Sequence, residues 1–330
     1  MTAHQIANSS PRRHNAFGAM SFNDTDISWQ VLRGIVRDWA GTSAELAEVK
    51  PLAGGMINTT LLLTTQDNQR AVLKISPHRV NREYEREAHQ LDLLRSIGVP
   101  TPQVYKLDIG SLDDPHSFIL MEFIEGHNLA EAKHHCTLPQ FDQLQQHLGE
   151  LVSKMHDQTS PVYRRVTAEE GPSFQRWPDF YRHVYDPIVK EIEHNHEIHH
   201  KQRKQIRKVH DKLDQLLAHH DCPRLVHWDI WSTNLLCKPD DSGHWRIRAV
   251  LDPMCKFAHC EAEIAYIDLF HTSTHAFTQS YQHGHRLDDS YHRVRKLIYQ
   301  LYPLINHVNL YGHEYVKPML TALERAGTLV

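Results

Sequence analysis

The part of the sequence that decides the fold is the stretch L-V-H-W-D-I-W-S-T-N-L-L, residues 225–236. In it, His227 precedes Asp229 by two positions, and Asn234 follows Asp229 by five. The spacing H-x-D-x-x-x-x-N is typical of loops that carry out phosphoryl transfer. A further carboxylate, Asp252, follows the apolar run A-V-L on the next predicted hairpin. We therefore expect three oxygen-bearing side chains to meet at one site.

Phosphoryl transfer explains why these residue types stand at these positions. A carboxylate must accept the proton of a substrate hydroxyl as the hydroxyl attacks phosphorus, and we assign this role to Asp229. Amide and carboxylate oxygens are ligands that Mg²⁺ prefers, so Asn234 and Asp252 are the predicted magnesium ligands. The sequence thus predicts a magnesium-dependent site for phosphoryl transfer.

The residues that precede this stretch supply groups suited to a nucleotide. Gly54 and Gly55 allow a close backbone turn over phosphates. Lys74 ends a short β-rich run, where a lysine can pair with phosphates, and Glu87 stands on a predicted helix thirteen residues later, where it can hold that lysine. A single lysine or glutamate of this kind is usually a solvated surface charge. Their order before the H-x-D-x-x-x-x-N stretch favours the functional interpretation.

The predicted strand S-F-I-L-M-E-F-I, residues 117–124, is a candidate for binding adenine. Adenine needs an exposed carbonyl and an exposed amide at the end of a strand, in an apolar environment. Met121, Glu122, Phe123 and Ile124 occupy that end. A buried strand without a ligand is the alternative interpretation of the same run.

Hydrophobic periodicity divides the chain into a β-rich part and a helical part. Residues 1–25 are polar and are expected to form a loose tail. Residues 26–124 begin with a predicted helix and continue as short alternating strands around one further helix. In residues 125–330 helical periodicity dominates, and one hairpin interrupts it. The order predicts an N-terminal nucleotide-binding lobe with a small antiparallel sheet, followed by a larger helical lobe that carries catalysis and binds the acceptor.

Composition excludes several classes of protein. The 330 residues carry a net charge of −4, which provides no basic surface for nucleic acid. No run approaches 18 apolar residues, so we expect no membrane span. Five cysteines with scattered spacing and no C-x-x-C favour reduced thiols in a cytoplasmic protein. The 28 histidines are best interpreted as surface residues on solvated helices.

The chain resembles the fructosamine kinase-like branch of the aminoglycoside phosphotransferase and protein kinase-like superfamily. The resemblance covers residues 45–328 and rests on a series of short segments. These are P-L-A-G-G-M-I-N, V-L-K-I, E-R-E-A-H-Q-L-D-L-L, F-I-L-M-E-F-I-E-G, L-V-S-K-M-H-D, F-Y-R-H-V-Y-D-P, H-W-D-I-W-S-T-N, V-L-D-P-M, A-H-C-E-A-E-I-A-Y-I-D-L-F and R-V-R-K-L-I-Y-Q-L-Y-P-L-I-N-H-V-N-L-Y-G.

The resemblance implies a two-lobed protein kinase-like fold of the α+β class and ATP-dependent phosphorylation of a small-molecule hydroxyl. It implies that Asp229 is the base, that Asn234 and Asp252 bind magnesium, and that Lys74, held by Glu87, contacts the phosphates. It further makes Met121 the gatekeeper, with the backbone of Glu122 and Ile124 facing adenine. Trp231 becomes a face for a sugar ring, and Glu263 a buried acid that steadies the catalytic loop.

The acceptor implied by the resemblance is a ketoamine, a sugar joined to an amine, such as a glycated lysine on a small molecule or on a protein. The chain departs from the branch at Trp228, where the branch usually has glycine. The indole either reshapes the acceptor pocket or points away and packs. Two alternatives stay open: another hydroxyl acceptor (an aminoglycoside, or a choline-like or homoserine-like alcohol), and a non-catalytic nucleotide-binding regulator.

Overall fold

The structure is a computed structural model of the chain, and it describes residues 19–22, 25–52, 59–76, 82–110, 116–218 and 221–330. Two compact units make up the fold. The smaller one consists of residues 1–88 and 102–123, and the larger one of residues 89–101 and 124–330, in each case within the described ranges.

The smaller unit is built on one five-stranded antiparallel sheet with the strand order β3-β4-β5-β7-β6. Strand β4 alternates between buried and half-buried residues along its whole length, and five of the six residues of β7 are buried. The short β-rich runs identified in the sequence therefore form the expected sheet. Its strands are β3 (Leu46–Pro51), β4 (Thr59–Thr65), β5 (Arg70–Ser76), β6 (Val104–Asp108) and β7 (Ser117–Glu122).

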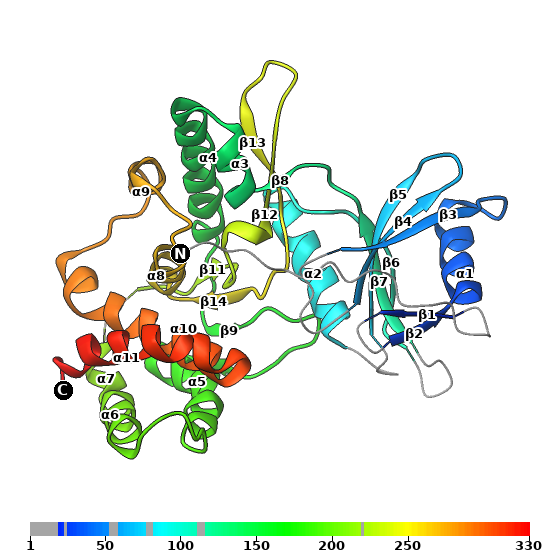
Figure 1. Cartoon of the computed structure of the whole chain (residues 1–330). Helices are drawn as coiled ribbons and strands as arrows, with labels where there is room; N and C mark the ends of the chain where they lie inside the picture. The colour runs from blue at the N-terminus through cyan, green and yellow to red at the C-terminus, as the bar shows by residue number, and fades with distance from the viewer. Residues whose placement is uncertain (1–18, 23–24, 53–58, 77–81, 111–115, 219–220) are drawn as a thin grey trace. The chain divides into compact units, whose positions relative to one another are not determined.

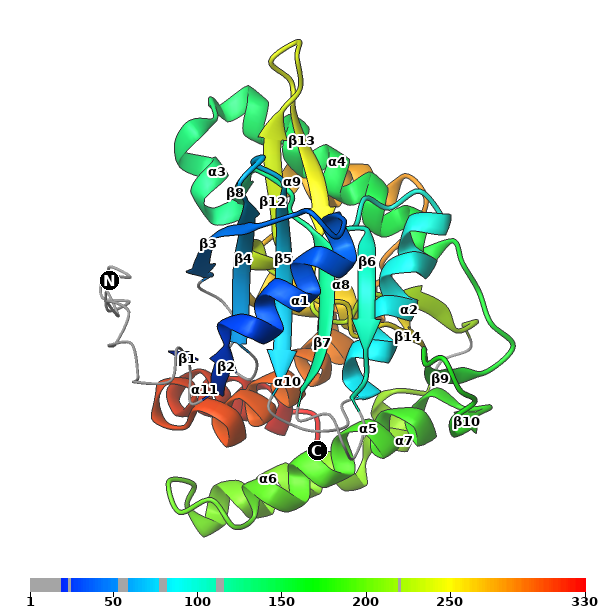
Figure 2. The same cartoon turned by 90° about the vertical axis from the view of Figure 1, so that its right-hand side faces the viewer.

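Helix α1 (Trp29–Ala40) covers one face of this sheet, as Figure 2 shows. Leu32 and Val36 of α1 are fully buried in one apolar cluster with residues of β4, β5 and β7. The helix was expected from Asp26 but begins at Trp29, because β2 (Thr25–Ser28) pairs with β1 (Ala19–Phe22) and Ser28 caps the helix. The predicted loose tail lies outside the described residues up to residue 18, and β1 belongs to a strand pair.

The larger unit is mainly helical, as expected. Figure 1 shows α8, α10 and α11 near one another, and one apolar core extends through α4, α5, α8 and α10. Helix α2 (Arg82–Ser96) begins in the smaller unit and ends in the larger one. The other helices are α3 (Leu129–His135), α4 (Leu138–His156), α5 (Trp177–Ile192), α6 (His200–Asp211), α7 (Leu213–Leu216), α8 (Cys260–Leu269), α9 (His275–Gln282), α10 (Lys296–Tyr311) and α11 (His313–Gly327), with a 3₁₀ turn η1 (Ser232–Asn234) and a π turn η2 (Tyr291–Arg295).

Two small sheets of the larger unit position the residues of interest. One joins β8 (His127–Asn128) to the predicted hairpin of β12 (Leu235–Pro239) and β13 (Trp245–Val250). The other has the order β10-β9-β14-β11. Its strands are two or three residues long, too short for an alternating pattern, and most were not predicted. They are β9 (Tyr163–Arg165), β10 (Ser173–Phe174), β11 (Arg224–Val226) and β14 (Lys256–Ala258).

The histidines are not all at the surface, so the expectation from composition is wrong in part. The cluster His194, His196, His199 and His200 is exposed, but four other histidines are buried. These are His156, His227, His259 and His285. The five cysteines are free thiols. No helix in the described part of the chain combines the length and the apolar character needed to cross a membrane.

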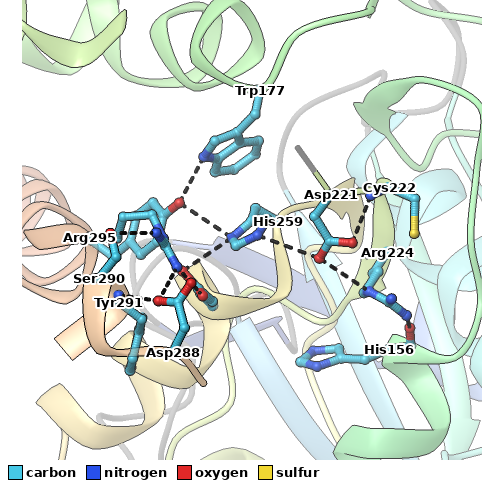
Figure 3. A network of polar contacts seen from close by, with 12 residues as sticks. His156, Trp177, Asp221, Cys222, Arg224, His259, Asp288, Ser290, Tyr291 and Arg295 are labelled. Carbon is cyan, nitrogen blue, oxygen red and sulfur yellow. Dashed lines mark hydrogen bonds and ion pairs between the residues drawn. The ribbon is translucent and has the colours of Figure 1, made fainter. Parts of the chain in front are cut away.

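A buried ion pair ties α8 to the start of α10. Arg295 donates to both carboxylate oxygens of Glu261 at 2.5 and 2.6 Å, and both residues are about 95% buried. Arg295 also donates to Asp288 and Ser290 (Figure 3). Burial raises the pKa of Glu261, and the hydrogen bonds from Arg295 oppose this rise. The pair therefore holds a charge that the core would otherwise disfavour.

We predict that Arg295→Met lowers the free energy of unfolding by about 3 kcal/mol, because it leaves the Glu261 carboxylate buried without its partner. Urea unfolding measures the change. Arg176→Met is the matched control, since Arg176 pairs with Asp214 on the exposed surface, and it should change stability little. Equal losses in the two variants would contradict the prediction.

Candidate active site

The predicted catalytic loop, residues 227–234, lies between β11 and β12, where the backbone brings Asp229 and Asn234 together. The Asn234 side-chain amide donates to Asp229 Oδ2 and to the Asp229 backbone carbonyl, both at 3.0 Å. The 3₁₀ turn η1 ends at Asn234 and brings this residue back toward Asp229. The five-residue spacing seen in the sequence thus has a geometric cause.

Asp252 follows β13 and is tied to the same loop through its neighbour. The Leu251 N–H donates to the Asn234 carbonyl at 2.8 Å. Asp252 has a φ of +54°, a left-handed conformation that is uncommon for a residue with a side chain. Its negative charge is close enough to affect the pKa of Asp229. The three predicted oxygen-bearing side chains therefore belong to one region of the larger unit.

Burial raises the pKa of the Asp229 carboxyl above its ordinary value. The Tyr266 hydroxyl, the nearby His227 and the Asn234 amide oppose the rise, whereas the charge of Asp252 adds to it. Burial also lowers the pKa of His227, which is fully buried and accepts a hydrogen bond from the Asp229 N–H through Nδ1 at 3.3 Å. A neutral His227 is consistent with that accepting role.

Tyr266 was not identified from the sequence, yet it contacts the predicted base directly. Its hydroxyl donates to Asp229 Oδ1 at 2.6 Å. Tyr266 lies in α8, and most residues of this helix are buried on every side. No amphipathic pattern could therefore single it out. The one available signal was its position three residues after Glu263 in the segment A-H-C-E-A-E-I-A-Y-I-D-L-F.

Trp228 adopts a left-handed backbone conformation with a φ of +73°. Its N–H donates to Glu263 Oε1 at 2.6 Å. Its indole packs over the Lys256 ammonium, 4.4 Å from the ring centre, and lies near Tyr185. The side chain therefore packs against the larger unit, which answers one question left open by the sequence. Trp231, in contrast to Trp228, is 39% exposed.

Glu263 connects the catalytic loop to the core. Its second oxygen lies 2.9 Å from His156 Nε2, and His156 Nδ1 lies 2.8 Å from the Tyr281 hydroxyl. Glu263 and His156 have no exposed side-chain surface. His156 also accepts, at its backbone carbonyl, a hydrogen bond from Arg224 next to the loop (Figure 3). The buried acid implied by the resemblance thus contacts the loop at the backbone of Trp228.

In the smaller unit, Lys74 of β5 and Glu87 of α2 form the expected ion pair. Their charged atoms are 2.6 Å apart, and each side chain is 15% exposed. Such limited exposure is unusual for a surface charge pair. Gly54 and Gly55 lie outside the described residues.

The predicted adenine-binding segment is the end of β7. Met121 is 5% exposed and is therefore buried. The Glu122 N–H donates to the Gln103 carbonyl at 2.8 Å, so this N–H is already used within the sheet. Ile124 is half-buried and is the first residue after the break between the two units.

Comparison with known families shows which family the chain belongs to. The model of the fructosamine kinase family matches residues 28–326. The chain belongs to the fructosamine kinase family. Membership confirms the expected ATP-dependent small-molecule kinase and its α+β, protein kinase-like fold.

Individual relatives in this family are distant but align over most of their length. A protein of Enterococcus faecium named "Probable ketoamine kinase" is 29% identical over 280 residues, which is 81% of this chain and 91% of the relative. The chloroplastic protein-ribulosamine 3-kinase of Oryza sativa subsp. japonica is 25% identical over 339 residues, which is 97% of this chain and 91% of the relative.

Solved structures share the fold at lower identity. A structure described as a fructosamine-3-kinase of Haemophilus somnus 129PT has a TM-score of 0.71 at 21% identity, and covers 90% of this chain and 97% of its own. A thermostable mutant of an aminoglycoside phosphotransferase has a TM-score of 0.62 at 17% identity, and covers 89% and 96%. At these identities the similarity supports the fold.

For this fructosamine kinase family member, we predict that Tyr266→Phe moves the acidic limb of the pH–rate profile to higher pH. The hydroxyl lowers the Asp229 pKa, so its removal leaves the Asp229 carboxyl protonated up to a higher pH. The measurement is kcat/KM for phosphorylation of an accepted substrate against pH.

The control for this prediction is Tyr299→Phe. It removes another buried hydroxyl of the same unit, one that accepts from Trp177 at 2.9 Å, and it should leave the profile in place. An unshifted limb in Tyr266→Phe, or the same shift in both variants, would show that Tyr266 does not set the protonation of Asp229.

Proposed function

We propose that the protein phosphorylates a sugar hydroxyl of ketoamines with ATP and Mg²⁺. The observation that carries the proposal is the hydrogen-bonded pair of Asp229 and Asn234 in a chain that belongs to the fructosamine kinase family. The names of the relatives, ketoamine kinase and protein-ribulosamine 3-kinase, support an acceptor of the glycated-amine class.

In the proposed reaction, Asp229 is the base. The acceptor hydroxyl oxygen forms a bond to the γ-phosphorus, the bond from that phosphorus to the bridging oxygen of ADP breaks, and the hydroxyl proton moves to Asp229. Tyr266 and Asn234 hold the two carboxylate oxygens in place. Burial raises the Asp229 pKa, which makes the carboxylate a better proton acceptor than a solvated one.

The donor set next to the base fits a magnesium ion. The Asn234 amide turns its nitrogen toward Asp229, so its oxygen is not used in that contact. Asp252 adds a carboxylate, and both are hard oxygen ligands of the kind Mg²⁺ prefers. Bound Mg²⁺ would neutralise charge on the phosphates of the nucleotide. We propose Asn234 and Asp252 as the residues that hold it.

Nucleotide binding is proposed for residues of the smaller unit. Lys74 would pair with the phosphates, and Glu87 keeps its ammonium in position through their 2.6 Å contact. Gly54 and Gly55, which lie outside the described residues, are proposed from the sequence to approach the phosphates. Adenine would lie against Met121 and use backbone groups of Glu122 and Ile124.

For the acceptor, we propose that the exposed indole of Trp231 provides a face for the sugar ring. Trp228, packed over Lys256, would shape the neighbouring backbone rather than stack on the sugar. Small glycated amines are the proposed substrates, and exposed glycated side chains of proteins are candidates of the same chemistry.

Two other functions receive less support. Phosphorylation of an aminoglycoside or a choline-like or homoserine-like alcohol would use the same base, but the similarity to aminoglycoside phosphotransferases supports the fold alone. A non-catalytic regulator would have no use for a base whose two oxygens are held by Tyr266 and Asn234.

We predict that Asp229→Asn lowers kcat by at least about a thousandfold while ATP still binds, because the amide accepts no proton. The measurement combines single-turnover phosphate transfer with equilibrium binding of a non-hydrolysable ATP analogue. Asp241→Asn, on the exposed tip of the β12–β13 hairpin, is the control and should retain activity. Near-normal turnover in Asp229→Asn would refute the assignment of the base.

We further predict that glucose- and ribose-derived ketoamines are phosphorylated with kcat/KM at least about tenfold above aminoglycosides, choline and homoserine. The measurement is ATP consumption across the panel, with NMR to locate the phosphate on each product. A preference for one of the non-ketoamine alcohols would overturn the proposed substrate class and leave the kinase assignment intact.

A further inference from the structure

A groove of about 550 Å³ lies in the larger unit, between the end of α8 and the helices α10 and α11. Figure 1 shows α10 and α11 running side by side at the C-terminal end of the chain. Apolar side chains form much of the lining, among them Phe270, Leu304 and Tyr315. Neither the catalytic loop nor any residue assigned above lines the groove.

A continuous series of aromatic rings connects the groove to the base. Tyr266, which donates to Asp229, packs against Phe270 with ring centres 4.7 Å apart. Phe270 lies 5.1 Å from the His307 ring, and His307 lies 4.7 Å from Tyr315. Phe270 and Tyr315 both line the groove. The groove therefore begins at Phe270, which packs directly against Tyr266, the residue that contacts Asp229.

Helix α10 supports the same connection. Leu304 lines the groove, and His307 and Tyr311 follow it at helical spacing on the same face. The charge of Asp229 contributes to the pKa of both His307 and Tyr311, although burial is the larger influence on each. From Tyr311 to His307 the helix rises about 6 Å, a distance that an extended aliphatic chain of about six carbons spans.

The groove carries uncompensated positive charge. Lys317 and Arg325 of α11 line it, eight residues apart and so on one side of the helix. Among the described residues, neither has an ion-pair partner, whereas Asp268, the acidic residue of the lining, is 2.8 Å from Lys296 and accepts from Gln300. Antiparallel packing places Lys317 at the end nearer the base. The groove thus offers an apolar surface followed by a cation.

We propose that this groove binds the amine portion of the acceptor when that portion carries a carboxylate on an aliphatic chain. The inference rests on the proposed ketoamine kinase activity and extends it to the far end of the substrate. The aliphatic chain lies along Phe270 and Tyr315, and the carboxylate reaches the Lys317 ammonium. The protein accordingly prefers glycated ω-amino acids and similar anionic ketoamines over neutral ones.

The test compares two acceptors that differ only at the far end: the glucose ketoamine of 6-aminohexanoate and that of 6-aminohexanamide. For the wild-type protein we expect a KM roughly fivefold lower for the carboxylate, with similar kcat, because a partly exposed ion pair contributes modestly. Lys317→Glu should remove this difference or reverse it, and Lys317→Gln should give an intermediate KM. The KM of the amide should stay unchanged.

Arg293→Glu is the matched control. It makes the same change in net charge at an 80% exposed side chain of η2, and both acceptors should respond to it equally. Because Lys317 is exposed, its variants are expected to fold, and thermal unfolding checks this.

Equal KM values for the two acceptors in the wild-type protein would overturn the proposal, as would equal effects of Lys317→Glu on both acceptors. Phosphorylation of neither ketoamine would instead refute the proposed function, from which the inference about the groove follows. The two failures are therefore distinguishable.

Discussion

The catalytic loop depends on one partly buried hydrogen bond, from the Trp228 N–H to the Glu263 carboxylate at 2.6 Å. The left-handed backbone at Trp228 costs about 1–3 kcal/mol for a residue with a side chain, so it persists only where its surroundings determine it. Glu263 is fixed in turn by His156 in the core. The core of the larger unit therefore determines the backbone conformation next to Asp229, and with it the orientation of the Asp229 side chain.

As the proposed base, Asp229 must meet two requirements that oppose each other. A base must be desolvated enough to accept a proton, yet it must be ionised before the reaction. Burial supplies the first condition, and the hydrogen bonds from Tyr266 and Asn234 supply the second. Tyr266 also connects Asp229 to the aromatic rings that lead to the groove between the end of α8 and the helices α10 and α11. In the proposed mechanism, Tyr266 thereby links the protonation of Asp229 to recognition of the acceptor.

The sequence was sufficient to predict residues whose spacing follows from local geometry. Asp229 and Asn234 are linked by a short turn, and Lys74 and Glu87 by a strand and the helix after it, so each pair is visible in order along the chain. Tyr266 could not be predicted, because α8 is buried nearly all round and its contact with Asp229 joins distant segments. The short strands and the buried histidines escaped prediction for a similar reason: tertiary contacts determine them, and no periodicity reports them.

The central claim is that the core presents the Asp229 carboxylate to the hydroxyl that receives phosphate. A crystal structure of the protein with a non-hydrolysable ATP analogue, Mg²⁺ and a ketoamine tests it most directly. We expect one sugar hydroxyl oxygen within about 3 Å of the Asp229 carboxylate and in line with the γ-phosphorus. A bound ketoamine whose in-line hydroxyl contacts another side chain, with Asp229 turned away from it, would contradict the account.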